Sequence, residues 1–171
     1  MLVRRAVPSD AAVLAALGAS TFTDAFGHLY SAEDLQAFLD ESHAVSAYET
    51  LLRSPLYALW LAEDGGQAVG YALAGPCGLP HEDARPEHGE LKRLYVTGTA
   101  QGGGVGARLF DAALAWLERE GPRPLWISVW SENYGAQRFY GRYGFEKAGE
   151  YEFIVGQQRD REFIYRRFPG A

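Results

Sequence analysis

Four glycines occur within five residues in the segment from Gln101 to Ala107 (QGGGVGA), between a predicted strand and a predicted helix. Glycine lets the backbone come close to a ligand, and the first amides of a helix have no partner within the helix. Such amides, together with the helix dipole, favour a phosphate. The segment therefore indicates a phosphate-binding loop, with a tight strand-to-helix turn as the alternative. The groups expected to bind the phosphate are the backbone groups of Gln101, Gly102, Gly103, Gly104, Val105, Gly106 and Ala107.

The residues around the glycines narrow the type of phosphate ligand. A nucleoside-triphosphate loop needs Gly-Lys followed by Ser or Thr, whereas Gly106 is followed by Ala-Arg, which excludes that class. The spacing Gly102-x-Gly104-x-x-Ala107 fits a relaxed dinucleotide fingerprint, and Glu132 follows the next predicted strand, so a Rossmann-type domain stays open. Two observations argue against a Rossmann-type domain. Only one strand–helix–strand unit is convincing, and the chain is short for a nucleotide-binding half plus a substrate half.

A few other side chains could take part in catalysis. Glu90 begins a predicted strand and could act as a general base, or be a solvated acid at a strand end. Tyr140, on a predicted helix, shares an apolar face with Phe139 and Tyr143, as an ordinary core aromatic would. Cys77 has no adjacent histidine, so we expect a structural thiol. His81 and His88 match no metal-ligand spacing, and no metal site is expected.

Hydrophobic periodicity and helix-start residues predict the elements that position these groups. The expected strands are Leu2–Val7, Tyr57–Glu63, Gln67–Ala74, Glu90–Val96, Leu125–Trp130, Tyr151–Val155 and Glu162–Arg167. The expected helices follow Pro8-Ser9-Asp10, begin after the cap Ser31, cover Ala44–Arg53, follow the glycine loop, and include Ala136 to Tyr143 before Gly144. The order is β-α-α-α-β-β-β-α-β-α-β-β.

The helix after the glycine loop has the clearest amphipathic pattern. Its apolar residues at i, i+4, i+7, i+8 and i+11 are Val105, Leu109, Ala112, Ala113 and Trp116. The central strand–helix–strand unit implies a right-handed parallel crossover, and the hairpins on either side make the sheet mixed. We therefore expect a single α/β domain over residues 1–171, with a mixed twisted sheet of about seven strands flanked by helices.

Composition and charge restrict the partners. The 171 residues include 16 Lys and Arg against 22 Asp and Glu, a net charge of −6, which disfavours a nucleic-acid backbone and favours a cationic ligand. The single cysteine excludes an intramolecular disulfide framework. The apolar run Leu56–Ala62 is far shorter than the roughly 18 residues of a membrane span. We expect a cytoplasmic protein with no nucleic-acid or membrane partner.

Three segments, in the correct order, resemble the Gcn5-related N-acetyltransferase (GNAT) superfamily. The pattern Gln101-x-x-Gly104-x-Gly106 is similar to that family's acyl-CoA pyrophosphate loop, and Glu90–Val96 resembles the strand that leads into it. Asn133–Phe145 is similar to the later helix that packs beside the pantetheine arm. The resemblance implies a GNAT-type fold and acetyl-CoA as the cofactor.

The resemblance also implies roles for single residues. Backbone groups of Leu94, Tyr95 and Val96 would pair with pantetheine like an added strand, and one amide would polarise the thioester carbonyl. Tyr140 lies where the family commonly places a general acid near the sulfur. Glu90 is the candidate base, directly or through water, because an amine with a pKa of about 10 is mostly protonated at neutral pH. The residues expected beside the cofactor on the later helix are Asn133, Ala136 and Phe139.

Softer patterns resemble the PaiA-like branch of bacterial polyamine and small-amine acetyltransferases. They lie at Thr21–His28, Ser31–Leu35 and Leu125–Asn133. In this family the segment Thr21–Arg53 overhangs the acceptor site, and its acidic balance would attract a polyamine, although any single acid could instead lie on a solvated helix face. The residues expected to contact the acceptor are Asp24, Phe26, His28, Tyr30, Glu33, Asp34 and Trp130.

The sequence therefore favours an N-acetyltransferase that moves acetyl from acetyl-CoA to the primary amine of a small molecule, above all a polyamine, by direct attack in a ternary complex. Peptide or protein acetylation, at an N-terminus or a lysine, is the first alternative. A non-catalytic acyl-CoA-binding regulator and a dinucleotide-binding Rossmann-type domain are alternatives of another class. The expected partner is a small-molecule amine, and the chain could also form a homodimer.

Overall fold

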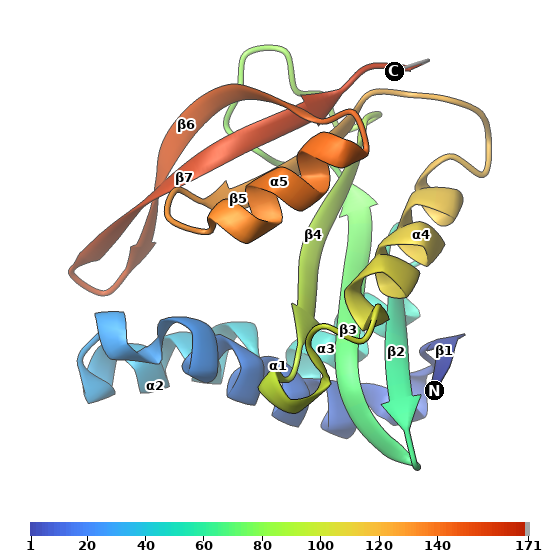
Figure 1. Ribbon diagram of the computed structural model, residues 1–171. Coiled ribbons are helices and arrows are strands. Elements are labelled where there is room, and N and C mark those ends of the chain that lie inside the picture. The colour runs from blue at the N-terminus through green and yellow to red at the C-terminus, as the bar shows by residue number, and fades with distance from the viewer. Residues whose placement is uncertain (170–171) are drawn as a thin grey trace.

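The computed structural model describes residues 1–169 and contains one seven-stranded mixed sheet with helices on both faces (Figure 1). The strands lie in the order β1-β2-β3-β4-β5-β7-β6. They are β1 (Leu2–Arg5), β2 (Ala58–Asp64), β3 (Gln67–Pro76), β4 (Gly89–Val96), β5 (Leu125–Trp130), β6 (Glu146–Val155) and β7 (Gln158–Arg167). The helices are α1 (Ala11–Phe26), α2 (Ala32–Ser42), α3 (Val45–Arg53), α4 (Val105–Leu117) and α5 (Tyr134–Arg142). Among them, none is long and apolar enough to span a bilayer.

The order of elements is the one that the sequence predicts, and the sheet topology decides between the two predicted folds. Within residues 1–169, β4 and β5 form the single parallel pair, connected through α4, and every other neighbouring pair is antiparallel. A Rossmann-type sheet is built from successive parallel strands. The Rossmann alternative is therefore wrong.

Two large apolar cores lie on opposite faces of the sheet, and a small third cluster contains Cys77, Trp126 and Ile164. On one face, α4 packs Leu109, Phe110 and Ala113 against the sheet, as the amphipathic pattern predicts. On the other face, α1 and α3 bury Leu14 and Tyr48. Since both faces are covered, the later half of β4 lies between two helical layers.

Strands β4 and β5 stay paired over only three positions. Gly89, Glu90 and Leu91 pair with Leu125, Trp126 and Ile127, and the ladder between the two strands ends there. Beyond this point β4 continues along β3, while β5 continues along β7. The sheet thus opens into two halves, which diverge visibly in Figure 1. One edge of β4 consequently has no strand partner after Leu91.

A β-bulge at Lys92 changes which side chains of β4 share a face. Leu91 pairs with Ala74, and Arg93 pairs with Leu73, so Lys92 is an extra residue in the ladder. Bulges often re-aim side chains beside functional sites. The extra residue shifts the alternation of faces along β4, and Arg93, directly after the bulge, contacts Tyr48 of α3.

The last hairpin is longer than the sequence predicts. The predicted strands began at Tyr151 and Glu162, whereas β6 begins at Glu146 and β7 at Gln158, with a turn at Gly156 (φ +57°). The added positions are rich in charged residues, which an exposed edge strand tolerates because its outer face contacts water. The predicted loop at residues 156–160 was therefore too long, and Asp160 belongs to a strand.

The contact between α1 and α3 gives a test of the packing. A Cβ on Gly18 would overlap the Tyr48 hydroxyl, and Tyr48 is fully buried. We expect Gly18→Ala to lower the free energy of unfolding by about 1–3 kcal/mol, because the buried ring cannot move without disturbing its neighbours. Urea denaturation measures this change.

Gly141→Ala is the matched control. Gly141 also lies in a helix, but no atom lies within 4 Å of the position of an added Cβ. We expect equal or greater stability, by up to about 1 kcal/mol, because alanine favours a helix. Equal stability of Gly18→Ala and the unmodified protein would contradict the tight contact of α1 with α3.

Candidate active site

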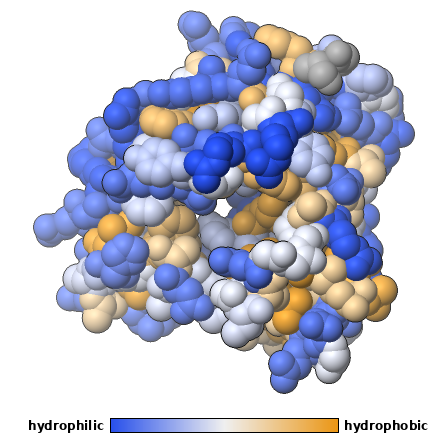
Figure 2. Space-filling model, in the orientation of Figure 1, coloured by the Kyte–Doolittle hydropathy of each residue, from blue (hydrophilic) through white to orange (hydrophobic). Residues whose placement is uncertain are grey.

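A cleft of about 370 Å³, here called the central cleft, lies where β4 and β5 separate. Its wall includes Phe22 and Phe38 from the α1–α2 side of the sheet. It also includes Ala136 and Tyr140 of α5, which pack on the opposite face. The cleft therefore passes through the sheet, and Figure 2 shows an opening near the middle of the molecular surface.

The glycine loop lies at the N-terminus of α4 and has the conformation of an anion-binding turn. Gly102 and Gly104 have φ of +85° and +80°, a region in which other residues are strained. Gly104 is the N-cap of α4, and no side chain caps the helix. The amides of Val105, Gly106 and Ala107 open the helix and lack intrahelical partners. These groups could hold a phosphate.

The residues predicted beside the cofactor lie at different distances from the central cleft. Leu94 and Tyr95 of β4, together with Asn133 and Ala136, line it. Asn133 caps α5, its Oδ1 accepting from the Ala136 amide at 3.1 Å. Val96 lies at the end of β4, where its carbonyl accepts from Gln101 Nε2 at 3.1 Å and so fixes the glycine loop. Phe139 packs on Phe110 instead, with 5.1 Å between ring centroids.

Tyr140 lies in the wall of the central cleft and is only 7% exposed. Its ring stacks on Phe110, with centroids 5.7 Å apart. Within residues 1–169 the Tyr140 hydroxyl has no hydrogen-bond partner. Its oxygen is not fully buried, because every fully buried side-chain nitrogen or oxygen in this part of the chain has a partner. Burial raises the pKa of this hydroxyl well above its usual value, so it keeps its proton at neutral pH.

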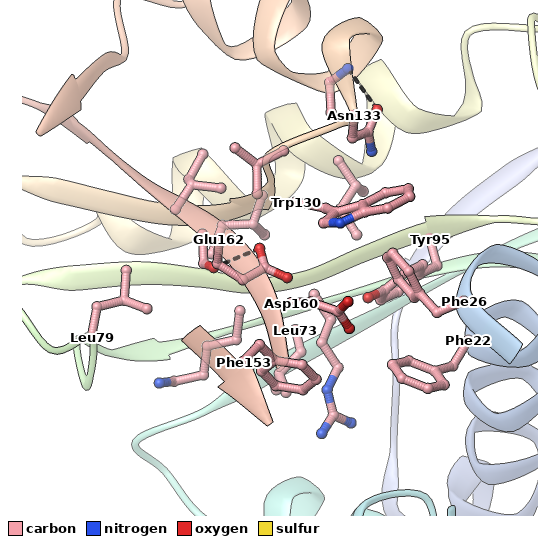
Figure 3. A pocket seen from close by; sticks show the side chains of 18 of the residues that line it. Phe22, Phe26, Leu73, Leu79, Tyr95, Trp130, Asn133, Phe153, Asp160 and Glu162 are labelled. Carbon is pink, nitrogen blue, oxygen red and sulfur yellow. Dashed lines mark hydrogen bonds between the residues drawn. The ribbon is translucent and has the colours of Figure 1, made fainter. Parts of the chain in front are cut away.

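On the α1–α2 side, aromatic rings line the cleft (Figure 3). Phe22 stacks on Phe38 at 4.6 Å, and Phe26 meets the edge of Trp130 at 5.6 Å. Phe38 also contacts Phe153 of β6 at 5.9 Å. The rings of Phe22, Phe26 and Phe38, carried by α1 and α2, thus cover the half of the sheet formed by β5, β7 and β6. We call these three rings the aromatic roof.

Two carboxylates of β7 lie under this aromatic roof. Asp160 is 6% exposed and accepts hydrogen bonds from Tyr30 at 2.7 Å and from Gln158 at 3.0 Å. Glu162, two residues further, accepts from Ser128 at 3.3 Å. Burial raises the pKa of Glu162 to about 7; the hydrogen bond from Ser128 partly offsets this rise, and the Asp160 charge adds a smaller increase. Glu162 can therefore take up a proton near neutral pH.

Glu90 also lines the central cleft, but its carboxylate is already engaged. It is 6% exposed, and its Oε1 accepts hydrogen bonds from Lys92 Nζ at 2.8 Å and from the Gly78 amide at 3.0 Å. The resulting ion pair with Lys92 anchors the residue to β4 and to the loop after β3.

The predicted acceptor residues divide into two groups. Phe26, Tyr30 and Trp130 line the central cleft. Four others are not among the residues that line it: Asp24, His28, Glu33 and Asp34. Asp34 instead accepts a hydrogen bond from the Gln157 amide at 3.3 Å, so it fastens α2 to the β6–β7 turn. The acidic helices therefore do not supply the acids of the cleft.

The sequence analysis missed Asp160 and Glu162, although a signal was present. Residues two apart on a strand face the same side. Asp160, Glu162 and the buried Ile164 follow this period, and extending the predicted strand to Gln158 would have placed both acids on one face. The charged neighbours Arg159 and Arg161 concealed the pattern.

Comparisons with known proteins assign the family. The model of the acetyltransferase (GNAT) family matches residues 20–145. An N-acetyltransferase of Mycobacterium tuberculosis is 31% identical over 93% of this chain and 97% of that protein. The crystal structure of the PaiA N-acetyltransferase from Thermoplasma acidophilum, in complex with coenzyme A, superposes with a TM-score of 0.77 at 17% identity, covering 98% of each chain.

A spermine/spermidine N(1)-acetyltransferase of Bacillus subtilis is 30% identical over 89 residues, which cover 52% of this chain and 59% of that protein. The split sheet and the matches to the family together define the class, and the chain belongs to the GNAT family of acetyltransferases. It is an N-acetyltransferase that uses acetyl-CoA.

Proposed function

We propose that this chain acetylates the primary amine of a small molecule by direct attack in a ternary complex. The observation that carries the proposal is the central cleft, which joins the unpaired edge of β4 on one side to a pair of carboxylates under an aromatic roof on the other. Such a cleft brings two substrates together from opposite faces of the sheet, which converts a bimolecular reaction into one within a complex.

The α4–α5 side suits coenzyme A. The glycine-loop amides, from Gly102 to Ala107, suit the pyrophosphate, because the start of α4 has no side-chain cap. The unpaired edge of β4 at Leu94 and Tyr95 suits the pantetheine amides, which would pair as an added strand. When bound, acetyl-CoA supplies a thioester carbonyl as the electrophile, and a β4 amide would polarise it.

On the other side, Glu162 is the proposed base in place of Glu90. With a pKa of about 7, it can accept the proton of an ammonium group, directly or through water. The amine nitrogen then bonds to the acetyl carbon as the carbon–sulfur bond breaks. Tyr140, which keeps its proton, is the proposed donor to the sulfur. The ammonium group thus gives one proton to Glu162, and the attacking nitrogen loses a second proton as the amide forms. That second proton restores Tyr140, directly or through water, after Tyr140 has protonated the sulfur, and Glu162 releases its proton to solvent.

A polyamine is one acceptor class that this site supports. Asp160 and Glu162 have no ion-pair partner within residues 1–169, and aromatic faces attract alkylammonium groups. The partial relative from Bacillus subtilis has a polyamine in its name. Peptide and protein amines are the alternative, disfavoured by the aromatic roof over a small cleft.

An acceptor screen at several pH values tests the proposal. We expect thiol release from acetyl-CoA with at least one small primary amine among polyamines, amino acids, aminoglycosides and peptides. Because Glu162 must be ionised to take a proton, kcat/KM should rise with pH through about 7. Glu162→Gln should lower kcat/KM by roughly 10²–10⁴ and abolish that dependence.

Glu152→Gln is the matched control, since Glu152 lies on the neighbouring strand, exposed and paired with Arg159 outside the cleft. Coenzyme A binding without thiol release for every amine would favour a non-catalytic acyl-CoA-binding regulator.

The loop assignment is tested by Gly104→Val. Valine is strained at φ +80°, so the amides at the start of α4 should move. We expect the Kd for coenzyme A, measured by calorimetry, to rise about tenfold or more, as for loss of a hydrogen bond to a charged group. Gly98→Val is the control, because Gly98 has open space and no positive φ. Unchanged affinity in a folded Gly104→Val variant would count against this loop.

The donor assignment is tested by Tyr140→Phe, which removes only the hydroxyl. Loss of a positioned general acid lowers kcat by roughly 10²–10⁴. A thiol has a pKa of about 8.5, so its thiolate leaves unaided at alkaline pH and the defect should shrink there. Tyr143→Phe is the control, at the C-cap of the same helix, since that hydroxyl donates to Asp111 instead. A normal kcat at neutral pH in Tyr140→Phe would rule out this donor.

A further inference from the structure

The α1–α2 side of the central cleft contains the acids Asp160 and Glu162 at one end. Arg93 of β4 forms a second polar end. The bulge at Lys92 turns this side chain towards α3, where Nη1 donates to the Tyr48 hydroxyl at 3.0 Å. The guanidinium carbon lies 5.7 Å from the centroid of the same ring. A guanidinium carries five N–H donors. Within residues 1–169, Tyr48 is its one side-chain or backbone acceptor, so most donors remain available.

Arg93 has no carboxylate within 4.0 Å in the described part of the chain, although the same cleft contains Asp160 and Glu162. Hydroxyl groups hold the opposite charges in place separately: Tyr48 bonds Arg93, Tyr30 bonds Asp160, and Ser128 bonds Glu162. A partly buried charge without an ionic partner is unfavourable. Separated charges of opposite sign therefore indicate a ligand that carries both complementary groups.

The positive charge at this end belongs to Arg93 and not to its neighbour His43. His43 lines the cleft and contacts the same Tyr48 hydroxyl, with Nδ1 at 2.8 Å. Burial, with a smaller effect of the Arg93 charge, lowers the pKa of His43 to about 4. The imidazole is therefore neutral at neutral pH, and the guanidinium is the group that an anion would meet.

We propose that the acceptor carries a carboxylate as well as its primary amine, with the carboxylate bound by Arg93 and the amine placed at Asp160 and Glu162. The inference rests on the proposed function, because it identifies the far end of the same acceptor. A guanidinium fork matches the two oxygens of a carboxylate, which gives both affinity and orientation. The acceptor is thus an amino acid or a related amino acid-like compound.

This arrangement ranks amino acids above polyamines. A polyamine that places one nitrogen at Glu162 brings a second ammonium group towards Arg93, where like charges repel. A simple alkylamine avoids the repulsion but leaves the guanidinium without a partner. The carboxylate-bearing amine alone satisfies both ends of the cleft.

Matched acceptors test the inference with the unmodified protein. Alkylamines, α,ω-diamines and ω-amino acids of equal chain length share the reacting amine and differ only at the far end. At the preferred length, we expect kcat/KM for the ω-amino acid to exceed that of its two counterparts by about 10- to 100-fold, the value of a hydrogen bond to a charged group. Diamines or alkylamines that match or exceed the amino acids overturn the inference and leave the proposed function intact. No acetylation of any amine refutes the proposed function itself.

Variants of Arg93 locate the effect. Arg93→Gln can still donate to Tyr48 but lacks the charge, so the preference for the ω-amino acid over the alkylamine should fall towards one. Arg93→Lys keeps the charge without the planar fork and should retain part of the preference. Arg53→Gln, at the exposed end of α3 and outside the cleft, should keep all of it.

A folded Arg93→Gln variant with the full preference overturns the inference. Thermal denaturation checks folding, and if Arg93→Gln does not fold, the comparison of acceptors with the unmodified protein still decides.

Discussion

The early end of the β4–β5 ladder is the constraint on which the site depends. Three paired positions hold the two halves of the sheet together, and each half then follows its own antiparallel neighbour. The right-handed twist of each half increases the separation along the strands. The unpaired β4 edge, the wall at Tyr140 and the acids of β7 all become accessible through this one opening. A continuous ladder would close the cleft and bury those groups.

Local signals predicted most of the framework, because they act within a few residues. The glycines at 102 and 104 do adopt positive φ, Ser31 does accept from the Asp34 amide as a cap, and the apolar stripe of α4 is buried. Glu90 was predicted and does line the cleft, but the two acids of β7 were not found in this way. The number of acidic residues in α1 and α2 pointed to Asp24 as an acid of the cleft. Composition, however, does not say which way a side chain faces. Phe22 and Phe26 of α1 line the cleft, whereas Asp24, two residues from each, does not. The two acids of the cleft that have no ion-pair partner within residues 1–169 come from β7, whose pairing with β5 depends on residues far away in the sequence.

The polar groups of the cleft are stabilised by hydroxyls more than by ion pairs. Tyr30, Tyr48 and Ser128 each bond a charged side chain, and these hydroxyl groups come from the α1–α2 connection, from α3 and from β5. A hydroxyl satisfies part of the hydrogen-bonding capacity of an ion without cancelling its charge. The ions are thereby fixed in position before a ligand arrives, which reduces the entropy lost on binding. Glu90 and Lys92 show the opposite arrangement, since their charges neutralise each other and serve the framework.

The aromatic roof is attached to the sheet less firmly than the elements below it. Helix α2 contains no buried residue, and its contacts with the hairpin include the Phe38–Phe153 edge and the bond from the Gln157 amide to Asp34. Segments with little buried surface open at a low cost in free energy. The glycine loop lies on the other face of the sheet, fixed by Gln101 to the end of β4. With the substrates placed as proposed above, the acetylated product would leave under α2 and coenzyme A would leave past α4, on opposite faces of the sheet, so neither ligand would block the path of the other.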